Sequence, residues 1–265
     1  MSNYNKHINS FSAQTDYNLY IFTEYCQVPN VAYIEENKTV KMLKVKPQEI
    51  TGEVGSIYYS DDTTTGPNDA VDTSKTPIGV IVQAPTVENG LKTILMSVYN
   101  INSDGTNYTS DYIEYHWGEN SASNTDNPEI PNDDKGDKDI SVYSGKAFTK
   151  VLVDKYGSDA QAAYACSIYS TEGTEVGDWY LPSVSELKQL YFLNSSVIDN
   201  TLTKLRDASK GYNMSPYTTY WSSSEKNNNT VYYFSLSYSS GIGDTYKTSS
   251  KSVRAFCTID PFKNL

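Results

Sequence analysis

The stretch from Tyr220 to Phe256 constrains the fold most, because its ends are apolar and its middle is polar. Trp221 stands near its start and Val253 near its end, while the interior is mainly Tyr, Ser, Asn, Thr and Gly. Tyrosine provides a large contact surface at low entropic cost, and small polar residues provide adaptable hydrogen bonds. This composition is typical of a recognition surface, although a polar loop that joins two strands would have it too.

The composition predicts a folded chain of the α+β class. Aromatic residues make up 13% of the 265 residues, which is more than a disordered chain contains. Short segments rich in Tyr and Thr favour strands, and helical periodicity follows Ser144. We expect an N-terminal β attachment module in residues 1–50 and a ligand-binding domain in residues 51–265, with an irregular acidic insertion at about 100–138.

The pattern of the chain predicts most elements individually. The expected strands are an N-terminal hairpin with Val31, Tyr33, Val40 and Met42 on its arms, then residues 57–59, 78–82, 91–98, 220–221, 231–236 and 252–258. The expected helices run from Ser144 to Gly157, from 160 to 167, after Ser183, and separately through 195–209. Residues 225–230 and 237–251 hold little that could be buried, so we expect loops that cluster at one edge of a small sheet.

Charge excludes several classes of partner. The formal net charge is −11 and the sequence contains no cluster of Lys and Arg, so we expect no nucleic-acid partner and no anionic membrane surface. No apolar run is long enough to span a bilayer, and the N-terminus lacks the pattern of a signal peptide. We therefore expect a protein made in the cytoplasm that does not insert into membranes.

The sequence predicts neither a metal site nor a cofactor. Cys26, Cys166 and Cys257 are far apart, which favours buried thiols over a disulfide framework or a zinc site. The acidic stretch 131–139 resembles a calcium loop but lacks the distal Glu, so a solvated acidic loop is the better interpretation.

Catalytic patterns are missing as well, so we expect no catalytic residue and no enzyme. His7 and His116 are not part of a nucleophile motif. Asp178 fits a turn better than a catalytic acid, and Glu186 is explained by a capping box with Ser183.

Three separated motifs resemble the C-type-lectin-like domains of gut-bacterial and phage proteins. GDWYLPSVSELKQLY at 177–191, YWSSSE at 220–225 and SVRAF at 252–256 match that family's successive patterns. The resemblance extends over roughly residues 51–258 and implies a C-type-lectin-like fold. It assigns Trp179, Leu181, Trp221 and Phe256 to the scaffold core.

A subset of this family comprises the variable proteins of diversity-generating retroelements, in which adenines of Asn codons are randomised. Such codons encode Asn, Ser, Tyr, Asp, Thr or Gly, but never Lys, so the resemblance implies that Lys226, Lys247 and Lys251 are fixed or differently encoded positions. It implies a ligand-binding surface made of Asn227, Asn228, Asn229, Tyr233, Ser235, Ser237, Tyr238, Ser240, Gly243, Asp244, Tyr246 and Ser249.

Together with the absence of a signal peptide, the resemblance implies a receptor-binding adhesin of a phage or prophage virion tail. Its partner would be a host-surface protein or glycan, and it would act as a homo-oligomer such as a trimer. The alternative is a fimbrial or cell-surface adhesin of a gut bacterium, with the same fold and no diversification.

Overall fold

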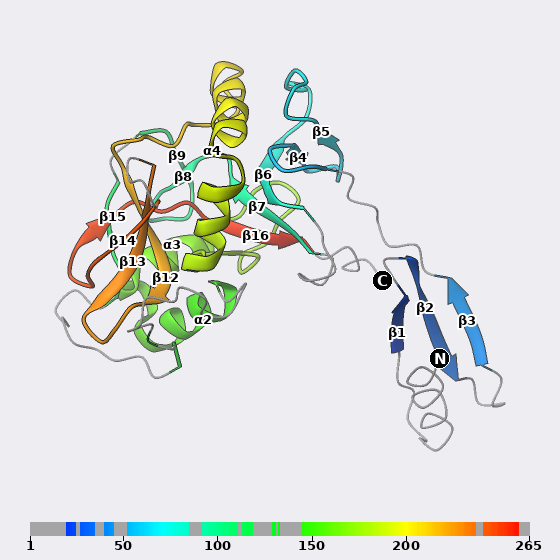
Figure 1. Cartoon of the computed structure of the whole chain (residues 1–265), viewed down its shortest axis with the longest axis horizontal. Coiled ribbons are helices and arrows are strands. Elements are labelled where there is room, and N and C mark those ends of the chain that lie inside the picture. Colours follow the sequence, from blue (N-terminus) through cyan, green and yellow to red (C-terminus); the bar gives the residue numbers. More distant parts are fainter. Residues whose placement is uncertain are drawn as a thin grey trace. The chain divides into compact units, whose positions relative to one another are not determined.

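The computed structural model of this chain describes 20–24, 27–34, 40–44, 52–84, 92–110, 113–118, 129–130, 132, 145–236 and 241–259, without the side chains of the first three ranges and of 191–195. It is a mixed α+β structure that divides into two compact units (Figure 1). The first contains three N-terminal strands, and the second spans Ile50–Asp260.

The N-terminal unit is an antiparallel three-stranded sheet. Its strands are β1 (Tyr20–Glu24), β2 (Gln27–Ile34) and β3 (Val40–Lys44), in that order across the sheet. Ile34 pairs with Val40 and Ala32 with Met42, which confirms the predicted hairpin.

A six-stranded antiparallel sheet forms the centre of the second unit. Its order is β11-β16-β7-β6-β4-β5, so β11 and β5 lie at the edges. The strands are β4 (Ile57–Tyr59), β5 (Thr64–Thr65), β6 (Pro77–Gln83), β7 (Thr93–Ser97), β11 (Trp179–Tyr180) and β16 (Phe256–Ile259). The apolar runs of β6 and β7 are buried at every position, because helices or strands pack against both faces.

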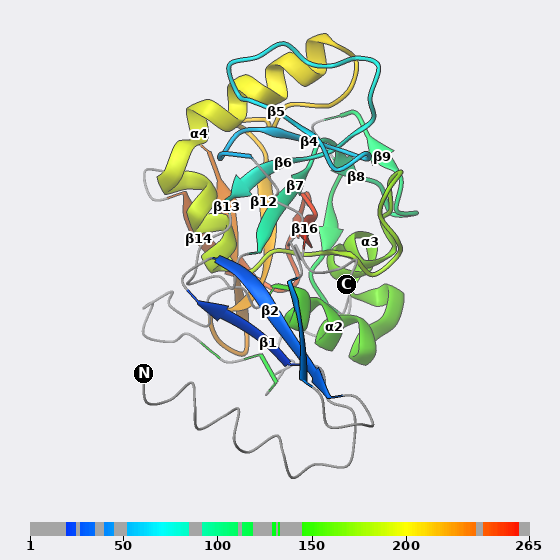
Figure 2. The ribbon, with the colours of Figure 1, turned by 90° about the vertical axis from the view of Figure 1, so that its right-hand side faces the viewer.

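Alternate residues of β7 enter two different hydrophobic clusters. Leu95 belongs to the cluster on the side of helices α2 (Gly145–Tyr156) and α3 (Gln161–Ile168). Ile94 and Met96 belong to the cluster that includes Leu187, Leu190 and Leu202 of helix α4 (Val184–Asp207). The sheet therefore separates the two cores, as the period of two along a strand requires (Figure 2).

One continuous helix replaces two expected ones. The sequence predicted a break near residue 195, but α4 extends over 24 residues. Its Ser183–Glu186 capping box is confirmed. The Asn and Ser residues at 194–196 are only moderate helix formers and do not end a helix without Pro or Gly. The apolar face at Leu187 and Leu190 continues through Ile198, Leu202 and Leu205, so burial favours uninterrupted helix.

A second antiparallel sheet contains most of the polar part of the stretch from Tyr220 to Phe256. Its strands are β12 (Thr219–Glu225), β13 (Thr230–Ser235) and β14 (Ile242–Tyr246). The expectation of a loop through 237–251 was wrong for β14 and for β15 (Ser250–Lys251). The strand β14 pairs with β13 from Ile242 to Tyr246, so backbone hydrogen bonds rather than apolar content define it.

The expectation of an irregular insertion at 100–138 was also partly wrong. The region begins with short strands β8 (Asn100–Ile101), β9 (Asn107–Tyr108) and β10 (Tyr115–His116), and β10 pairs with β15. Tyr115, Trp117 and Ile130 are buried in the core. These aromatic and aliphatic side chains join part of the acidic region to the scaffold, whereas 119–128, 131 and 133–144 are outside the described residues.

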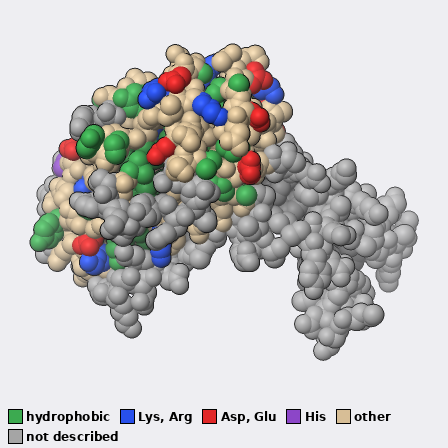
Figure 3. All heavy atoms as spheres, turned by 45° about the horizontal axis from the view of Figure 1, so that its top comes forward, with side chains coloured by type: hydrophobic (Ala, Val, Ile, Leu, Met, Phe, Trp, Pro, Cys, Tyr) green, Lys and Arg blue, Asp and Glu red, His purple; other side chains and the backbone are tan. Residues whose placement is uncertain are grey.

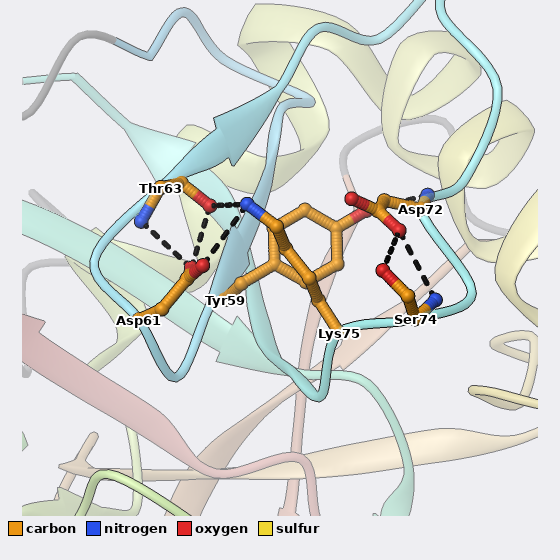
Figure 4. Close-up of polar contacts among 6 residues, drawn as sticks. All are labelled: Tyr59, Asp61, Thr63, Asp72, Ser74 and Lys75. Atoms are coloured by element: carbon orange, nitrogen blue, oxygen red, sulfur yellow. Dashed lines mark hydrogen bonds and ion pairs between the residues drawn. The ribbon is translucent and has the colours of Figure 1, made fainter.

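Two similar turns flank the loop between β4 and β6 (Figure 4). In one, the Asp61 carboxylate accepts hydrogen bonds from the Thr63 hydroxyl at 2.6 Å and the Thr63 amide at 3.2 Å. In the other, Asp72 accepts the same two bonds from Ser74, at 2.6 Å and 3.0 Å. Lys75 lies 3.0 Å from Asp61 and donates to the Thr63 hydroxyl, so the loop is tied down by local polar contacts.

We expect Asp61 to titrate at an unusually low pH. The Thr63 hydroxyl, followed by Lys75, lowers its pKa from 3.8 to about 2. A depressed carboxyl pKa stabilises the fold above 3.8, and this contribution is lost as the pH falls toward 2. In an NMR titration, Thr63→Ala should raise the Asp61 pKa toward its ordinary value and leave that of Asp72 unchanged. An unchanged Asp61 pKa would contradict this assignment.

Candidate ligand-binding surface

Hydrogen bonds join the first of the three sequence motifs to the second, and in the second the Trp221 amide donates to the Ser252 carbonyl of the third at 3.0 Å. In YWSSSE, the Ser223 amide donates to the Pro182 carbonyl at 2.8 Å, and the Ser224 hydroxyl accepts from the Val184 amide at 3.0 Å. The carbonyl of Ser222 accepts from the Trp117 indole at 2.7 Å. The start of α4 is therefore fixed to β12, and this motif has a structural role.

The third motif contributes a buried cation. The guanidinium of Arg254 donates to the Ser97 carbonyl at 2.9 Å and to the Tyr212 carbonyl. Burial lowers its pKa. Arg254 thus joins the C-terminal strand region to the end of β7. The predicted core residues are confirmed as buried: Trp179, Leu181, Trp221 and Phe256.

The structure distributes the predicted contact residues over several environments. Asn228, Asn229, Asp244 and Tyr246 are exposed, with 64% of Tyr246 accessible. A second group is half-buried and consists of Asn227, Tyr233, Gly243 and Ser249. Ser235 is only 1% exposed, so its predicted contact with a ligand was wrong. Ser237, Tyr238 and Ser240 are outside the described residues.

The predicted contact residues do not form one cluster of loops. Thr230 pairs with Tyr246 where β12 turns into β13, whereas Phe234 pairs with Ile242 at the opposite end of these strands. Six residues of strand span roughly 20 Å. The expectation of a single loop cluster was wrong because the stretch 237–251 contains a strand that separates its two ends.

The exposed residues at the β12–β13 end form a surface that we call the hairpin face: Asn228, Asn229, Asp244, Tyr246 and Thr248. Sequence reasoning missed Thr248, although threonine belongs to the same set of encodable residues. It also missed Asn132, whose side-chain amide nitrogen donates to the side-chain oxygen Oδ1 of Asn228 at 2.8 Å. That contact is between residues 96 positions apart, so no local signal could have revealed it.

Asn227 builds the turn below this surface. Its side-chain oxygen accepts hydrogen bonds from the amides of Asn229 and Thr230, both at 2.9 Å. Lys226 lies 2.8 Å from Asp244, and both side chains are about one third exposed. The hairpin face therefore presents amides, a hydroxyl, one aromatic ring and a carboxylate beside an ammonium group.

Beneath the hairpin face lies a buried ion pair. The Lys247 ammonium is 2.9 Å from the Glu225 carboxylate, and the two side chains are 3% and 0% exposed. The same ammonium lies 5.2 Å from the centre of the Trp117 ring. A charge removed from water needs a partner of opposite sign, and Glu225 provides it. Lys247 is thus an anchor, although both of its neighbours in sequence, Tyr246 and Thr248, are exposed.

Lys251, in strand β15, is also held by contacts with the scaffold. Its ammonium lies 4.0 Å above the Tyr233 ring and 5.4 Å from the Trp221 ring, and it donates to the Thr219 hydroxyl at 3.2 Å. Burial lowers its pKa. A Cβ atom at Gly243 would come 2.6 Å from the Tyr233 ring, so this glycine leaves room for the tyrosine. Tyr233, predicted to contact the ligand, therefore packs against Gly243, also predicted to contact it, and against the Lys251 ammonium group.

Asp178, which was considered as a catalytic acid, makes a structural contact, whereas His7 lies outside the described residues. The Asp178 carboxylate accepts a hydrogen bond from the Glu175 amide at 2.9 Å, which confirms its interpretation as a turn residue. Cys166 and Cys257 are buried free thiols, as predicted, and burial raises the pKa of Cys166. Within the described ranges, no three His, Cys, Asp or Glu side chains are grouped so that they could hold a metal ion.

Comparison with known proteins gives no family for this chain. No protein-family model matches the sequence, and no curated protein matches it. Over the described part of the chain, no helix combines the length and apolarity needed to cross a bilayer.

On the face that Figure 3 shows, positive and negative side chains are interspersed among polar ones.

Proposed function

We propose that the protein is a receptor-binding display protein whose hairpin face contacts the ligand. The observation that carries this proposal is the division between exposed and anchored positions along 226–251. Asn, Asp, Tyr and Thr occupy the exposed positions, and these types are encodable by randomised Asn codons. The two lysines that such codons cannot encode at 247 and 251 are both held by scaffold contacts.

This division supports a surface that changes while its scaffold stays constant. A side chain that points to water can be replaced at little cost in stability, whereas removal of a buried partner is expensive. All exposed positions among the described residues of 226–251 hold encodable types, whereas encodable types also occur at buried positions such as Ser235. The third lysine, Lys226, is partly exposed and pairs with the exposed Asp244, so it takes part in the face itself.

The proposal includes a C-type-lectin-like fold for the scaffold. The hydrogen bonds between the WYLPSVSE and YWSSSE motifs, and the burial of Arg254, support it. The partner is a host-surface protein or glycan, and the protein acts at a virion tail as a homo-oligomer such as a trimer. The N-terminal β unit provides attachment. A cell-surface adhesin without diversification is the alternative.

The gene sequence separates these two alternatives. If the surface is diversified, a near-identical template copy lies beside a reverse-transcriptase gene and differs from codons 220–256 only at adenines. The positions with substitutions should include 228, 229, 244, 246 and 248, and should exclude 247 and 251. A genome without such a template would reject diversification and leave the adhesin alternative.

We expect a triple substitution of Asn229, Asp244 and Tyr246 by Ala to abolish ligand binding. Loss of an exposed aromatic anchor and two polar contacts removes most of a small interface's energy, with each hot-spot residue contributing roughly 2 kcal/mol or more. The measurement is binding of the labelled protein to host cells, together with its melting temperature. Tyr217→Ala is a matched control, because Tyr217 is 85% exposed and lies outside the hairpin face. Retained binding by the triple variant would place the site elsewhere.

A further inference from the structure

A cavity of about 550 Å³ lies between helix α2 and the edge strand β11 and shares no residue with the hairpin face. Lys146, Ala147, Lys150 and Val153 line it from two turns of α2, and Trp179 and Tyr180 line it from β11. Sites for small molecules typically have volumes of roughly 300–1,000 Å³, so the cavity has the size of a ligand site.

The two walls are fixed independently of any ligand. The Thr149 hydroxyl of α2 donates to the Leu181 carbonyl at 3.2 Å and accepts from the Leu181 amide at 2.9 Å. Glu186 accepts from the Tyr180 hydroxyl at 2.8 Å and from the amide of Gly145, the first residue of α2. Helix and strand are therefore held in place beside the cavity, which is preformed.

The buried polar groups of the walls already have partners. The Trp179 indole donates to the Thr174 hydroxyl at 2.9 Å, and the Tyr180 and Thr149 hydroxyls make the bonds described above. Their remaining surface is apolar. The cavity therefore favours an apolar body over a polar one.

Charge distinguishes the two ends of the cavity. The first turn of α2 contains Lys146 and no acidic residue, although the positive end of a helix dipole disfavours a cation by about 0.3–1 kcal/mol. At the other end, Lys150 is 2.6 Å from Asp154, which neutralises it. The Glu186 carboxylate already accepts from the Gly145 amide at this end of the helix, so an anion in the cavity would be attracted by the Lys146 ammonium group.

We propose that this cavity binds a small amphipathic carboxylate, with its apolar body along Ala147 and Val153 and its carboxylate beside Lys146. The proposal does not depend on the function of the hairpin face. It is tested with decanoate below its micellar concentration, by isothermal titration calorimetry on the full chain. We expect saturable binding with one site per chain. Decyltrimethylammonium, which has the same tail and the opposite charge, should bind at least tenfold more weakly.

Two variants locate the site. Lys146→Glu should weaken decanoate binding at least tenfold, whereas Lys155→Glu, on the same helix but outside the cavity lining, should change it less than twofold. Ala147→Trp should abolish binding by filling the cavity, and its exposed position allows the fold to be kept, as a thermal melt would show. The proposal is overturned if decanoate does not saturate a single site, if the ammonium compound binds equally well, or if Lys146→Glu binds like the wild type.

Discussion

Lys247→Met is expected to destabilise the protein by about 3–5 kcal/mol, because it leaves the Glu225 carboxylate buried without its counter-charge. The two charged groups are 2.9 Å apart, and neither side chain is more than 3% exposed. Methionine is one heavy atom shorter but keeps most of the apolar stem that packs near Trp117, so the lost charge dominates the effect. Urea unfolding followed by tryptophan fluorescence would measure the change.

The double variant Glu225→Leu with Lys247→Met is the control for this prediction. Replacing both partners of a buried ion pair by apolar residues is often neutral, so the double variant should recover most of the lost stability. Lys150→Met is a second control, because its ion pair with Asp154 is exposed and contributes less than about 1 kcal/mol. If Lys247→Met cost no more than Lys150→Met, the ion pair would not be an anchor.

Glu186→Gln is expected to destabilise the protein by about 3 kcal/mol, because hydrogen bonds to a charged group contribute about 1.5–3 kcal/mol each. The carboxylate accepts from the Ser183 amide at 2.7 Å, from the Ser183 hydroxyl at 2.9 Å and from the Tyr180 hydroxyl at 2.8 Å. It also accepts from the Gly145 amide. Glutamine turns one acceptor into a donor that faces other donors.

The pH dependence provides an independent test of this prediction. Burial raises the pKa of Glu186 above 4.5 in the folded state. The folded protein therefore holds this proton more tightly, and its contribution to stability is full below pH 4.5 and declines as the pH rises through the folded pKa. The stability difference between wild type and Glu186→Gln should widen as the pH falls toward 4.5. The exposed Glu175→Gln is the control, and a difference that narrows with falling pH would contradict the expected shift.

The parts of the fold that depend on local chemistry could be predicted from the sequence. The Ser183–Glu186 capping box, the stop of α2 at Gly157 and the apolar strand Ile57–Tyr59 each depend on residues within a few positions. Trp179 and Trp221 are buried, as the resemblance of their motifs implied. These elements were found because their signals are short-ranged.

Non-local contacts determine the parts that were missed. The strand β14 has little apolar character, and it forms because β13 supplies partners for its backbone. By residue type, Lys247 would be expected at the surface. Its burial depends on the counter-charge of Glu225, which lies some twenty positions earlier in the sequence. Trp117 lay in a stretch that appeared irregular, and its partner, the Ser222 carbonyl, is 105 positions away. Residue type alone could not distinguish an anchor from a contact residue here.

The alternation along β14 has a consequence for the kinds of genetic change that the segment can accept. Tyr246 and Asp244 are exposed, and Lys247, directly after them, is buried. Because neighbouring strand residues point to opposite faces, insertion or deletion of one residue between 241 and 246 would move every later residue of the segment to the opposite face. Tyr246 would then leave its exposed position, and Lys247 would be displaced from Glu225. Replacement of exposed side chains keeps this register. The amino-acid sequence of the segment can therefore vary widely as long as its length stays constant.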